Sequence, residues 1–95
     1  MTTYLIFTRE SVQDQGELDR YLEQALPTLD GHPAQVLAAY GAEQCLEGEP
    51  SQGVVLVAFP SKKEALAWYQ SPRYQEVAQH RFKGARYRAL MVEGL

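Results

Sequence analysis

Apolar residues follow two patterns along the chain, and the two patterns alternate. Four short runs are rich in β-branched and aromatic residues, which predicts strands; they span residues 4–8, 35–40, 54–59 and 87–92. Between these runs, apolar residues return at every third or fourth position, which is the spacing of an amphipathic helix. The predicted order is therefore strand, helix, strand, strand, helix pair, strand. Residues 43–48 are expected to form a short strand extension or a hairpin arm, and residues 49–53 a turn.

The first helix carries signals for its start, its interruption and its end. Asp14 is expected to cap its N-terminus, with Glu17 three residues later as the partner in a capping box. Pro27 lacks an amide hydrogen and crowds the preceding turn, so the helix should kink or restart there. Gly31 can adopt the left-handed conformation that ends a helix. The apolar stripe of this helix consists of Leu18, Tyr21, Leu22, Ala25 and Leu29.

Two further helical segments follow the third strand. Ser61 and Glu64 form a capping box at the start of the first segment, and Ser71 followed by Pro72 marks the start of the second, which Gly84 ends. The apolar stripes are Ala65, Leu66, Trp68 and Tyr69 in the first segment and Tyr74, Val77, Ala78 and Phe82 in the second. Because Trp68 lies on such a stripe, its side chain is expected to be largely buried.

This order of elements predicts an α+β fold. A βαββαβ chain with right-handed crossovers forms a four-stranded antiparallel sheet with its helices on one face. A sheet covered on one side normally alternates apolar and polar residues, but residues 4–7, 36–40, 54–59 and 89–92 are apolar on both faces. A second copy of the chain is the expected cover of the open face, giving a dimeric α+β barrel. The alternative is a monomer in which long side chains and loops shield that face.

Length and charge limit the classes of partner. The 95 residues suffice for one domain, spanning 1–95, and the net charge of −3 argues against general binding of nucleic acid or anionic membranes. The charge sums to −7 over residues 1–50 and to +4 over residues 51–95. These unlike patches could steer self-association, or they could be two solvated faces. An RNA-recognition module would need exposed aromatic and basic residues on the third strand, where residues 54–59 hold one aromatic residue and no base.

Cysteine and histidine usage limits the chemistry further. Cys45 is the single cysteine, which excludes an internal disulfide and a zinc site built from cysteines and suits a reducing compartment. The apolar run at residues 4–7 is too short for a signal peptide or a membrane span, so a cytoplasmic protein is expected. His32 and His80 share no carboxylate at ligand spacing, and the chain has no glycine-rich phosphate loop or G-x-S-x-G nucleophile motif. No metal and no cofactor are expected.

One segment carries a specific motif. Residues 59–74 read F-P-S-K-K-E-A-L-A-W-Y-Q-S-P-R-Y, which resembles the F-P-S-x-x-x-A-x-x-W-Y-x-S-x-x-Y pattern of the family known as domain of unknown function 1330. L-E-G at 46–48, the proline-interrupted helix over 21–31 and V-E-G at 92–94 resemble further features of that family. Family members often have two glycines where this chain has G-H-P at 31–33. The resemblance covers nearly the whole chain and implies a ferredoxin-like, dimeric α+β barrel; it implies no activity.

Aromatic and basic residues suggest a ligand site between the sheet and its helices. Its candidate residues are Tyr4, Tyr40, Trp68, Tyr69, Tyr74, His80 and Arg81, with Tyr4 and Tyr40 expected on strands that are near neighbours. Tyrosine and tryptophan offer apolar surface with a polar tip, and the basic pair could receive an anion. One function is non-catalytic binding of a small apolar or anionic molecule. The other is a cofactor-independent enzyme of the monooxygenase, isomerase or decarboxylase type, with His80 as the catalytic proton-transfer group. The same residues could instead be core aromatics and a solvated helix end.

Overall fold

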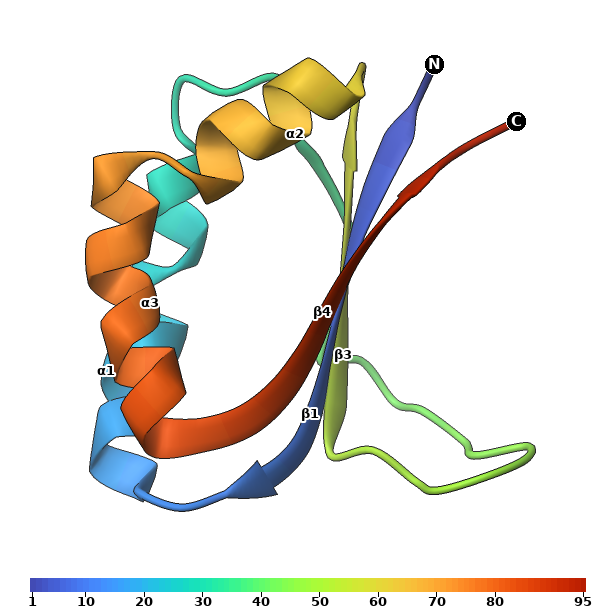
Figure 1. Ribbon diagram of the computed structural model, residues 1–95. Coiled ribbons are helices and arrows are strands. Elements are labelled where there is room, and N and C mark those ends of the chain that lie inside the picture. The colour runs from blue at the N-terminus through green and yellow to red at the C-terminus, as the bar shows by residue number, and fades with distance from the viewer.

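Residues 1–95 are all described by the computed structural model, in which helices pack against a single four-stranded sheet (Figure 1). The strands are β1 (Thr3–Val12), β2 (Gln35–Ala39), β3 (Gly53–Phe59) and β4 (Ala85–Glu93). The helices are α1 (Gln15–Gln24), the short 3-10 helix η1 (Leu26–Leu29), α2 (Lys62–Tyr69) and α3 (Pro72–Gly84). The predicted order of strands and helices is therefore confirmed.

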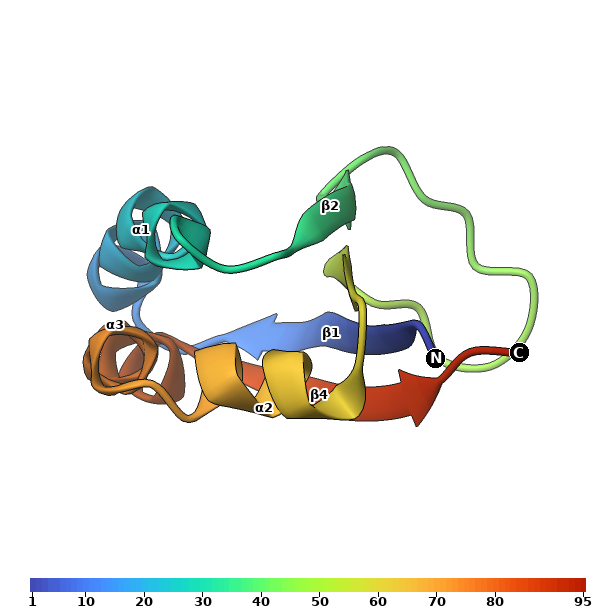
Figure 2. The same ribbon diagram turned by 90° about the horizontal axis from the view of Figure 1, so that it is seen from above.

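The sheet has the strand order β2-β3-β1-β4, and all three pairings are antiparallel. β1 is central, and its Leu5 lies opposite Val57 of β3 and Met91 of β4. Only β3 lies between β1, which carries Tyr4, and β2, which ends directly before Tyr40, so these strands are near neighbours, as expected. The helices all lie on one face of the sheet, with α1 and α3 side by side (Figures 1 and 2). This is the predicted α+β architecture.

The helix starts are fixed by the predicted capping residues. The side chains of Asp14, Ser61 and Ser71 each accept a hydrogen bond from the backbone amide three residues later. After α1 the chain continues through Pro27 as η1, so the proline changes the helix type rather than stopping the helix. Gly31 has a φ of 85°, the left-handed conformation expected at this helix end.

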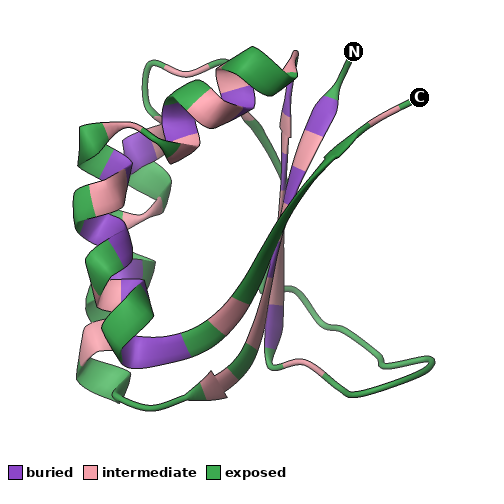
Figure 3. Cartoon of the chain, viewed as in Figure 1, coloured by how far each residue is buried: buried purple, intermediate pink, exposed green.

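Alternate residues of the two central strands face the helices and form the core. In β1 these are Thr3, Leu5 and Phe7, and in β3 they are Val57 and Phe59. The helices contribute Tyr21, Ala65, Trp68, Tyr74, Val77 and Ala78. Figure 3 shows buried positions on the central strands and along the helices that pack against them. Trp68 is 3% exposed, which confirms its predicted burial.

Three segments differ from what the sequence predicts. β1 continues to Val12 rather than ending at residue 8, because β4 pairs with its second half across a bulge between Arg9 and Ser11. Residues 43–48 form neither a strand nor a hairpin arm but part of an exposed loop. In α3 the expected core residue Phe82 is exposed and Arg81 is buried, since the last turn of the helix presents Arg81 to the sheet.

The other face of the sheet carries no helix and is apolar, as predicted. Opposite residues of antiparallel strands share a side, so the register places one apolar strip on this open face: Tyr4, Ile6, Leu56, Leu90 and Val92. Leu90 and Val92 are exposed on it. The loop over residues 40–52 projects on the same side, away from the helices, as both ribbon views show (Figures 1 and 2).

Candidate functional site

An apolar cavity of about 240 Å³ lies between the helix-facing side of the sheet and the first helical segment. The sheet lines it with Phe7, Ala39, Tyr40, Val55 and Val57. The helices line it with Tyr21, Leu22, Ala25, Leu26, Leu29 and Trp68. The break at Pro27 matters here, because it places Leu26 and Leu29 on η1, from which both reach the cavity.

Tyr40 lines this cavity with an unusual backbone, because it is the one non-glycine residue with a positive φ, 58°. This conformation costs a residue with a Cβ about 1–2 kcal/mol. The ring lies over Gly53, where a Cβ would come within 2.6 Å of it. Its hydroxyl is 2.7 Å from that of Tyr87, and the guanidinium carbon of Arg9 is 5.1 Å from its ring centroid. Tyr40 therefore reaches from the end of β2 to β4, and glycine at position 53 makes room for it.

Trp68 forms another part of the cavity wall. Its ring centroid is 4.2 Å from that of Tyr74 and 5.9 Å from that of Phe59. The indole N–H donates a 3.0 Å hydrogen bond to the hydroxyl of Thr28, which donates in turn to the carbonyl oxygen of Ala25. The polar edge of the indole is thus satisfied within the protein, and it ties α2 to the segment that carries the cavity's leucines.

Tyrosine hydroxyls near the cavity form two close pairs. The hydroxyls of Tyr21 and Tyr74 are 2.7 Å apart, as are those of Tyr40 and Tyr87. Burial raises the pKa of Tyr21 and that of Tyr40 far above the ordinary value, and the partner hydroxyl raises each pKa further. Burial also raises the pKa of Tyr74. These hydroxyls therefore stay protonated at neutral pH and serve as hydrogen-bonding groups rather than as bases.

Arg81 lies behind the cavity wall. Its guanidinium carbon is 5.5 Å from the ring centroid of Phe7 and 5.6 Å from that of Tyr21, two residues that line the cavity. Burial by itself would lower the pKa of Arg81, but the neighbouring tyrosine hydroxyls, Tyr74 first, outweigh it and the pKa is raised. The side chain therefore stays charged inside the protein.

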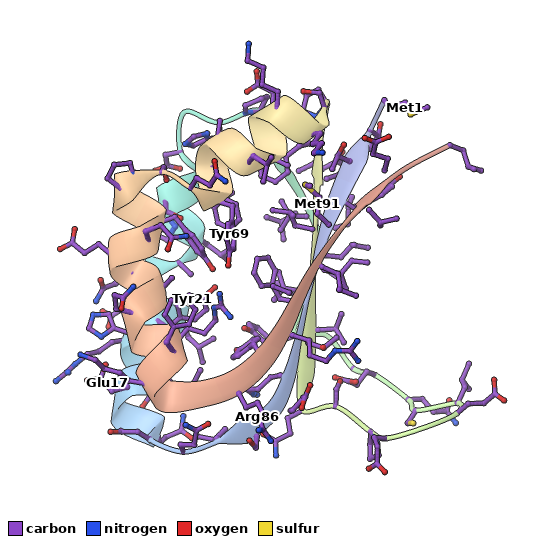
Figure 4. All side chains as sticks on the ribbon, viewed as in Figure 1. Met1, Glu17, Tyr21, Tyr69, Arg86 and Met91 are labelled. Atoms are coloured by element: carbon purple, nitrogen blue, oxygen red, sulfur yellow. The ribbon has the colours of Figure 1, made fainter.

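His80 is held in a contact between α1 and α3. Its Nδ1 is 2.6 Å from Oε2 of Glu17. This hydrogen bond lowers the pKa of Glu17 against the opposing effect of desolvation, and the electrostatic influence of His80, Arg20 and Lys83 lowers that pKa further. Figure 4 shows Glu17 on the helix layer away from the sheet, whereas Tyr21 and Tyr69 point into the space between helices and sheet. His80 is not among the residues that line the cavity.

The predicted site residues are only partly brought together. Tyr40 and Trp68 line the main cavity. Tyr69 lines a second, smaller one of about 170 Å³, which lies between α2 and the strands β1 and β4. Tyr74 and Arg81 pack behind the main cavity, on the rings that form its wall.

Tyr4 and His80 lie apart from the main cavity, which corrects the expectation of one common site. Tyr4 is opposite Ala58 and Val92, on the open face of the sheet. Side chains alternate between the faces of a strand, and the buried residues of β1 are the odd-numbered ones, Thr3, Leu5 and Phe7. Strand geometry implies this alternation, but residues 4–7 are all apolar, so the sequence does not show which set the helices cover.

Sequence reasoning did not single out three residues that shape the site. Phe7 and Tyr21 line the cavity and also contact Arg81, and Tyr87 holds the hydroxyl of Tyr40. Tyr21 lies on the apolar stripe of the first helix, which predicts its burial but no role in a binding site. Gly53 was the available signal for Tyr40, because a glycine at the start of a strand often marks a close approach.

Other kinds of site find less support in the structure. No three side chains of the His, Cys, Asp and Glu types gather as a metal ion would require. Cys45 is exposed in the loop over residues 40–52, with its sulfur 3.2 Å from the carbonyl oxygen of Gly48. None of the helices combines the length and the hydropathy needed to cross a bilayer. The apolar cavity is thus the feature best suited to hold a small molecule.

Solved structures of similar fold come from several bacteria. A protein of unknown function from Rhodopseudomonas palustris superposes with a TM-score of 0.78 at 16% identity, covering 99% of this chain and 82% of that one. A dimeric ferredoxin-like protein of unknown function from Jannaschia sp. CCS1 superposes with a TM-score of 0.72 at 18% identity, covering 99% of this chain and 100% of that one. A proposed antibiotic biosynthesis monooxygenase from Nitrosomonas europaea superposes with a TM-score of 0.65 at 12% identity, covering 100% of this chain and 99% of that one. Identities this low support a common ferredoxin-like fold and nothing more.

Comparison with curated proteins gives no match. Comparison with protein families does, because residues 2–95 match the family described as Domain of unknown function (DUF1330). The match spans almost the whole chain and includes the motif at residues 59–74. The chain therefore belongs to the DUF1330 family.

Proposed function

We propose that the protein binds a small apolar molecule in the cavity between its sheet and the α1–η1 segment, and that it does so as a homodimer. The observation that carries the proposal is the lining of the cavity, whose 11 residues are all apolar or aromatic. Its volume of about 240 Å³ lies just below the roughly 300–1,000 Å³ of drug-sized ligand sites. A molecule with one ring or a short chain fits this size, and the Tyr21 and Tyr40 hydroxyls could orient it.

The polar groups around the cavity favour binding over proton transfer. The raised pKa values of Tyr21 and Tyr40 keep both hydroxyls neutral, and the imidazole of His80 is bonded to Glu17 instead of facing the cavity. A cofactor-independent enzyme of the monooxygenase, isomerase or decarboxylase type is the second candidate. It is supported by the likeness of fold to the proposed monooxygenase from Nitrosomonas europaea. Conversion of a bound compound, seen as a mass change after incubation, would favour this second function.

The homodimer is proposed from the open face of the sheet. Ile6, Leu56, Leu90 and Val92 lie together there without a covering helix. Removing apolar surface from water is worth about 25 cal/mol per Å², and an identical sheet would offer a surface of the same kind. The similar protein from Jannaschia is described as dimeric. The loop over residues 40–52 projects on this side and would lie against the partner.

Ligand binding is tested by titrating ¹⁵N-labelled protein with two small neutral probes, benzyl alcohol and indole. We expect saturable shifts at the backbone amides of Leu22, Leu26 and Val55 and at the indole N–H of Trp68, because these residues enclose the cavity. Shifts that centre on Leu90 and the rest of the open face would contradict binding in the cavity between the sheet and the helices. Shifts that never saturate would contradict a specific cavity.

A matched pair of variants sharpens this test. Ala25→Leu adds a larger side chain inside the cavity wall, and Ala67→Leu adds the same atoms at an exposed position of α2. We expect Ala25→Leu to weaken binding of both probes by at least about tenfold, equivalent to about 1.4 kcal/mol, and Ala67→Leu to bind as the unaltered protein does. Equal affinities for the two variants would count against the cavity as the binding site.

A further inference from the structure

Arg81 is a buried cation without an acidic partner. It lies on the inner face of α3 and is 4% exposed, while the ion pairs of the molecule join Glu17 to Arg20 and to His80. The Nε and Nη2 atoms of Arg81 are buried and have no hydrogen-bond partner. Unpaired buried donors on a charged group are costly, and a guanidinium cannot escape that cost by losing its proton. The position therefore favours an acceptor that carries negative charge.

Aromatic rings surround the guanidinium and explain how its charge is tolerated. Its central carbon is 4.9 Å from the ring centroid of Phe82, 5.3 Å from that of Tyr87, 5.5 Å from that of Phe7 and 5.6 Å from that of Tyr21. Contacts of a cation with ring faces stabilise the positive charge. They do not occupy the N–H donors, which point outward in the plane of the guanidinium. The rings thus hold the cation and leave its Nε and Nη2 donors for another group.

This aromatic cage around Arg81 and the main cavity share a wall. Phe7 and Tyr21 belong to both. Tyr40 lines the cavity, and the hydroxyl it contacts belongs to Tyr87, a member of the cage. Arg81 is therefore one layer of side chains away from the cavity. No acidic side chain lines the cavity, so none of its lining residues would repel an anion.

We propose that the ligand of this cavity is a small apolar carboxylate, whose apolar body contacts Leu22 and Val55 and whose carboxylate lies between the Tyr40–Tyr87 hydroxyl pair and Arg81. Hydrogen bonds between a guanidinium and a carboxylate are about twice as strong as those between neutral groups. Tyr40 is the residue that moves to admit the carboxylate, since it is partly exposed and its backbone is held in a strained conformation. The inference rests on the proposed function, because it takes the same cavity and adds the charge of the ligand.

Phenylacetate and phenylacetamide have nearly the same shape and differ in charge, so together they distinguish binding in the cavity from a preference for a carboxylate. We expect phenylacetate to bind at least about tenfold more tightly, with both probes shifting Leu22 and Val55. We further expect the Nε–H resonance of Arg81 to move with phenylacetate and to stay in place with phenylacetamide. Equal affinities within the cavity would overturn the carboxylate inference and leave the proposed function standing. Binding of neither probe would overturn both.

Two methionine variants test the role of Arg81 itself. Arg81→Met keeps the length of the side chain and removes its charge, so phenylacetate should bind this variant no more tightly than phenylacetamide does. Lys83→Met changes the net charge by the same amount at an exposed position in the same turn of α3. This variant should keep the full preference for phenylacetate over phenylacetamide. A preference that survives in folded Arg81→Met, or that disappears in Lys83→Met, would contradict the inference. If Arg81→Met does not fold, the Arg81 Nε–H resonance of the unaltered protein decides.

Discussion

At the residue scale, Trp68 serves the core and the cavity at once. Its ring packs on Phe59 and Tyr74, and its indole N–H is bonded to Thr28. A large aromatic ring with a satisfied polar edge can lie at the wall of an apolar cavity without leaving a buried donor unpaired. The same residue therefore supports both the stability of the fold and the shape of the site.

Replacing Trp68 should be costly. Trp68→Ala removes a ring that is 3% exposed, so we expect the free energy of unfolding to fall by about 3–5 kcal/mol, measured by urea denaturation. Trp68→Phe keeps part of the ring and loses only the hydrogen bond to Thr28 and some volume, so its loss should be smaller. A loss below about 1 kcal/mol for the alanine variant would mean that the ring contributes little to the core.

The contact between Glu17 and His80 predicts a dependence of stability on pH. The pKa of Glu17 is lower in the folded protein than the ordinary 4.5, so the ionised carboxylate stabilises the fold above that pH. This contribution is lost as the pH falls through the lowered pKa of the folded state. Glu17→Gln should therefore be less stable than the unaltered protein at pH 6, and the difference should shrink on acidification below pH 4.5. Glu23→Gln, at an exposed position of α1, is the control and should show no such trend.

At the element scale, α1 and α3 approach each other closely at Gly84. A Cβ at this position would lie 2.5 Å from the backbone nitrogen of Leu18 and 3.1 Å from the carbonyl oxygen of Asp14. The carbonyl oxygen of Gly84 also accepts hydrogen bonds from the amides of Gln13 and Asp14, at 2.8 and 3.0 Å. The last turn of α3 thus fixes the start of α1, and with it the helix that lines the cavity.

Gly84→Ala should push these two helices apart. The added methyl meets backbone atoms, which cannot rotate out of the way, so we expect the free energy of unfolding to fall by about 1–3 kcal/mol, as for other overpacked sites. Gly41→Ala is the matched control, because a Cβ there meets no atom within 4 Å. Equal stability of the two variants, measured by thermal and urea denaturation, would show that the close approach at Gly84 is not needed.

At the scale of the whole molecule, the two faces of the sheet differ in what covers them. Its helix-facing side holds the core, and its open side holds Ile6, Leu56 and Leu90 with no helix over them. Any partner that binds the folded chain and not the unfolded chain adds to stability by mass action. The proposed homodimer, formed through this face, therefore predicts a stability that depends on protein concentration.

The melting temperature should rise with protein concentration across the micromolar range. Light scattering should give twice the mass of the chain at the upper end of that range. Leu56→Glu places a charge on the open face, so it should give a monomer whose melting temperature no longer depends on concentration. Ala67→Glu, on the exposed side of α2, should behave as the unaltered protein does. A monomeric mass with a stable thermal transition in the unaltered protein would exclude the proposed dimer.

Local and repeating features of the fold could be read from the sequence. Asp14, Ser61 and Ser71 cap helices because short polar side chains bond the free amides of a first turn, which depends on a few neighbouring residues. The strand order along the chain follows from apolar spacing, and the two-faced apolar character of residues 54–59 follows from composition. The motif at residues 59–74 indicated the family to which the chain belongs. Burial of Trp68 followed from its place on a helical stripe.

Tertiary structure decided what depends on contacts between distant residues. In β1 the odd-numbered residues face the helices, so Tyr4 lies on the open face. Alternation along a strand does not by itself determine which set of residues faces the helices. The last turn of α3 presents Arg81 to the interior, where the expected core residue was Phe82. The site was therefore predicted only in part. Residue types and spacing determine the elements, whereas a cavity and a buried charge arise from packing, which the linear order of residues does not contain.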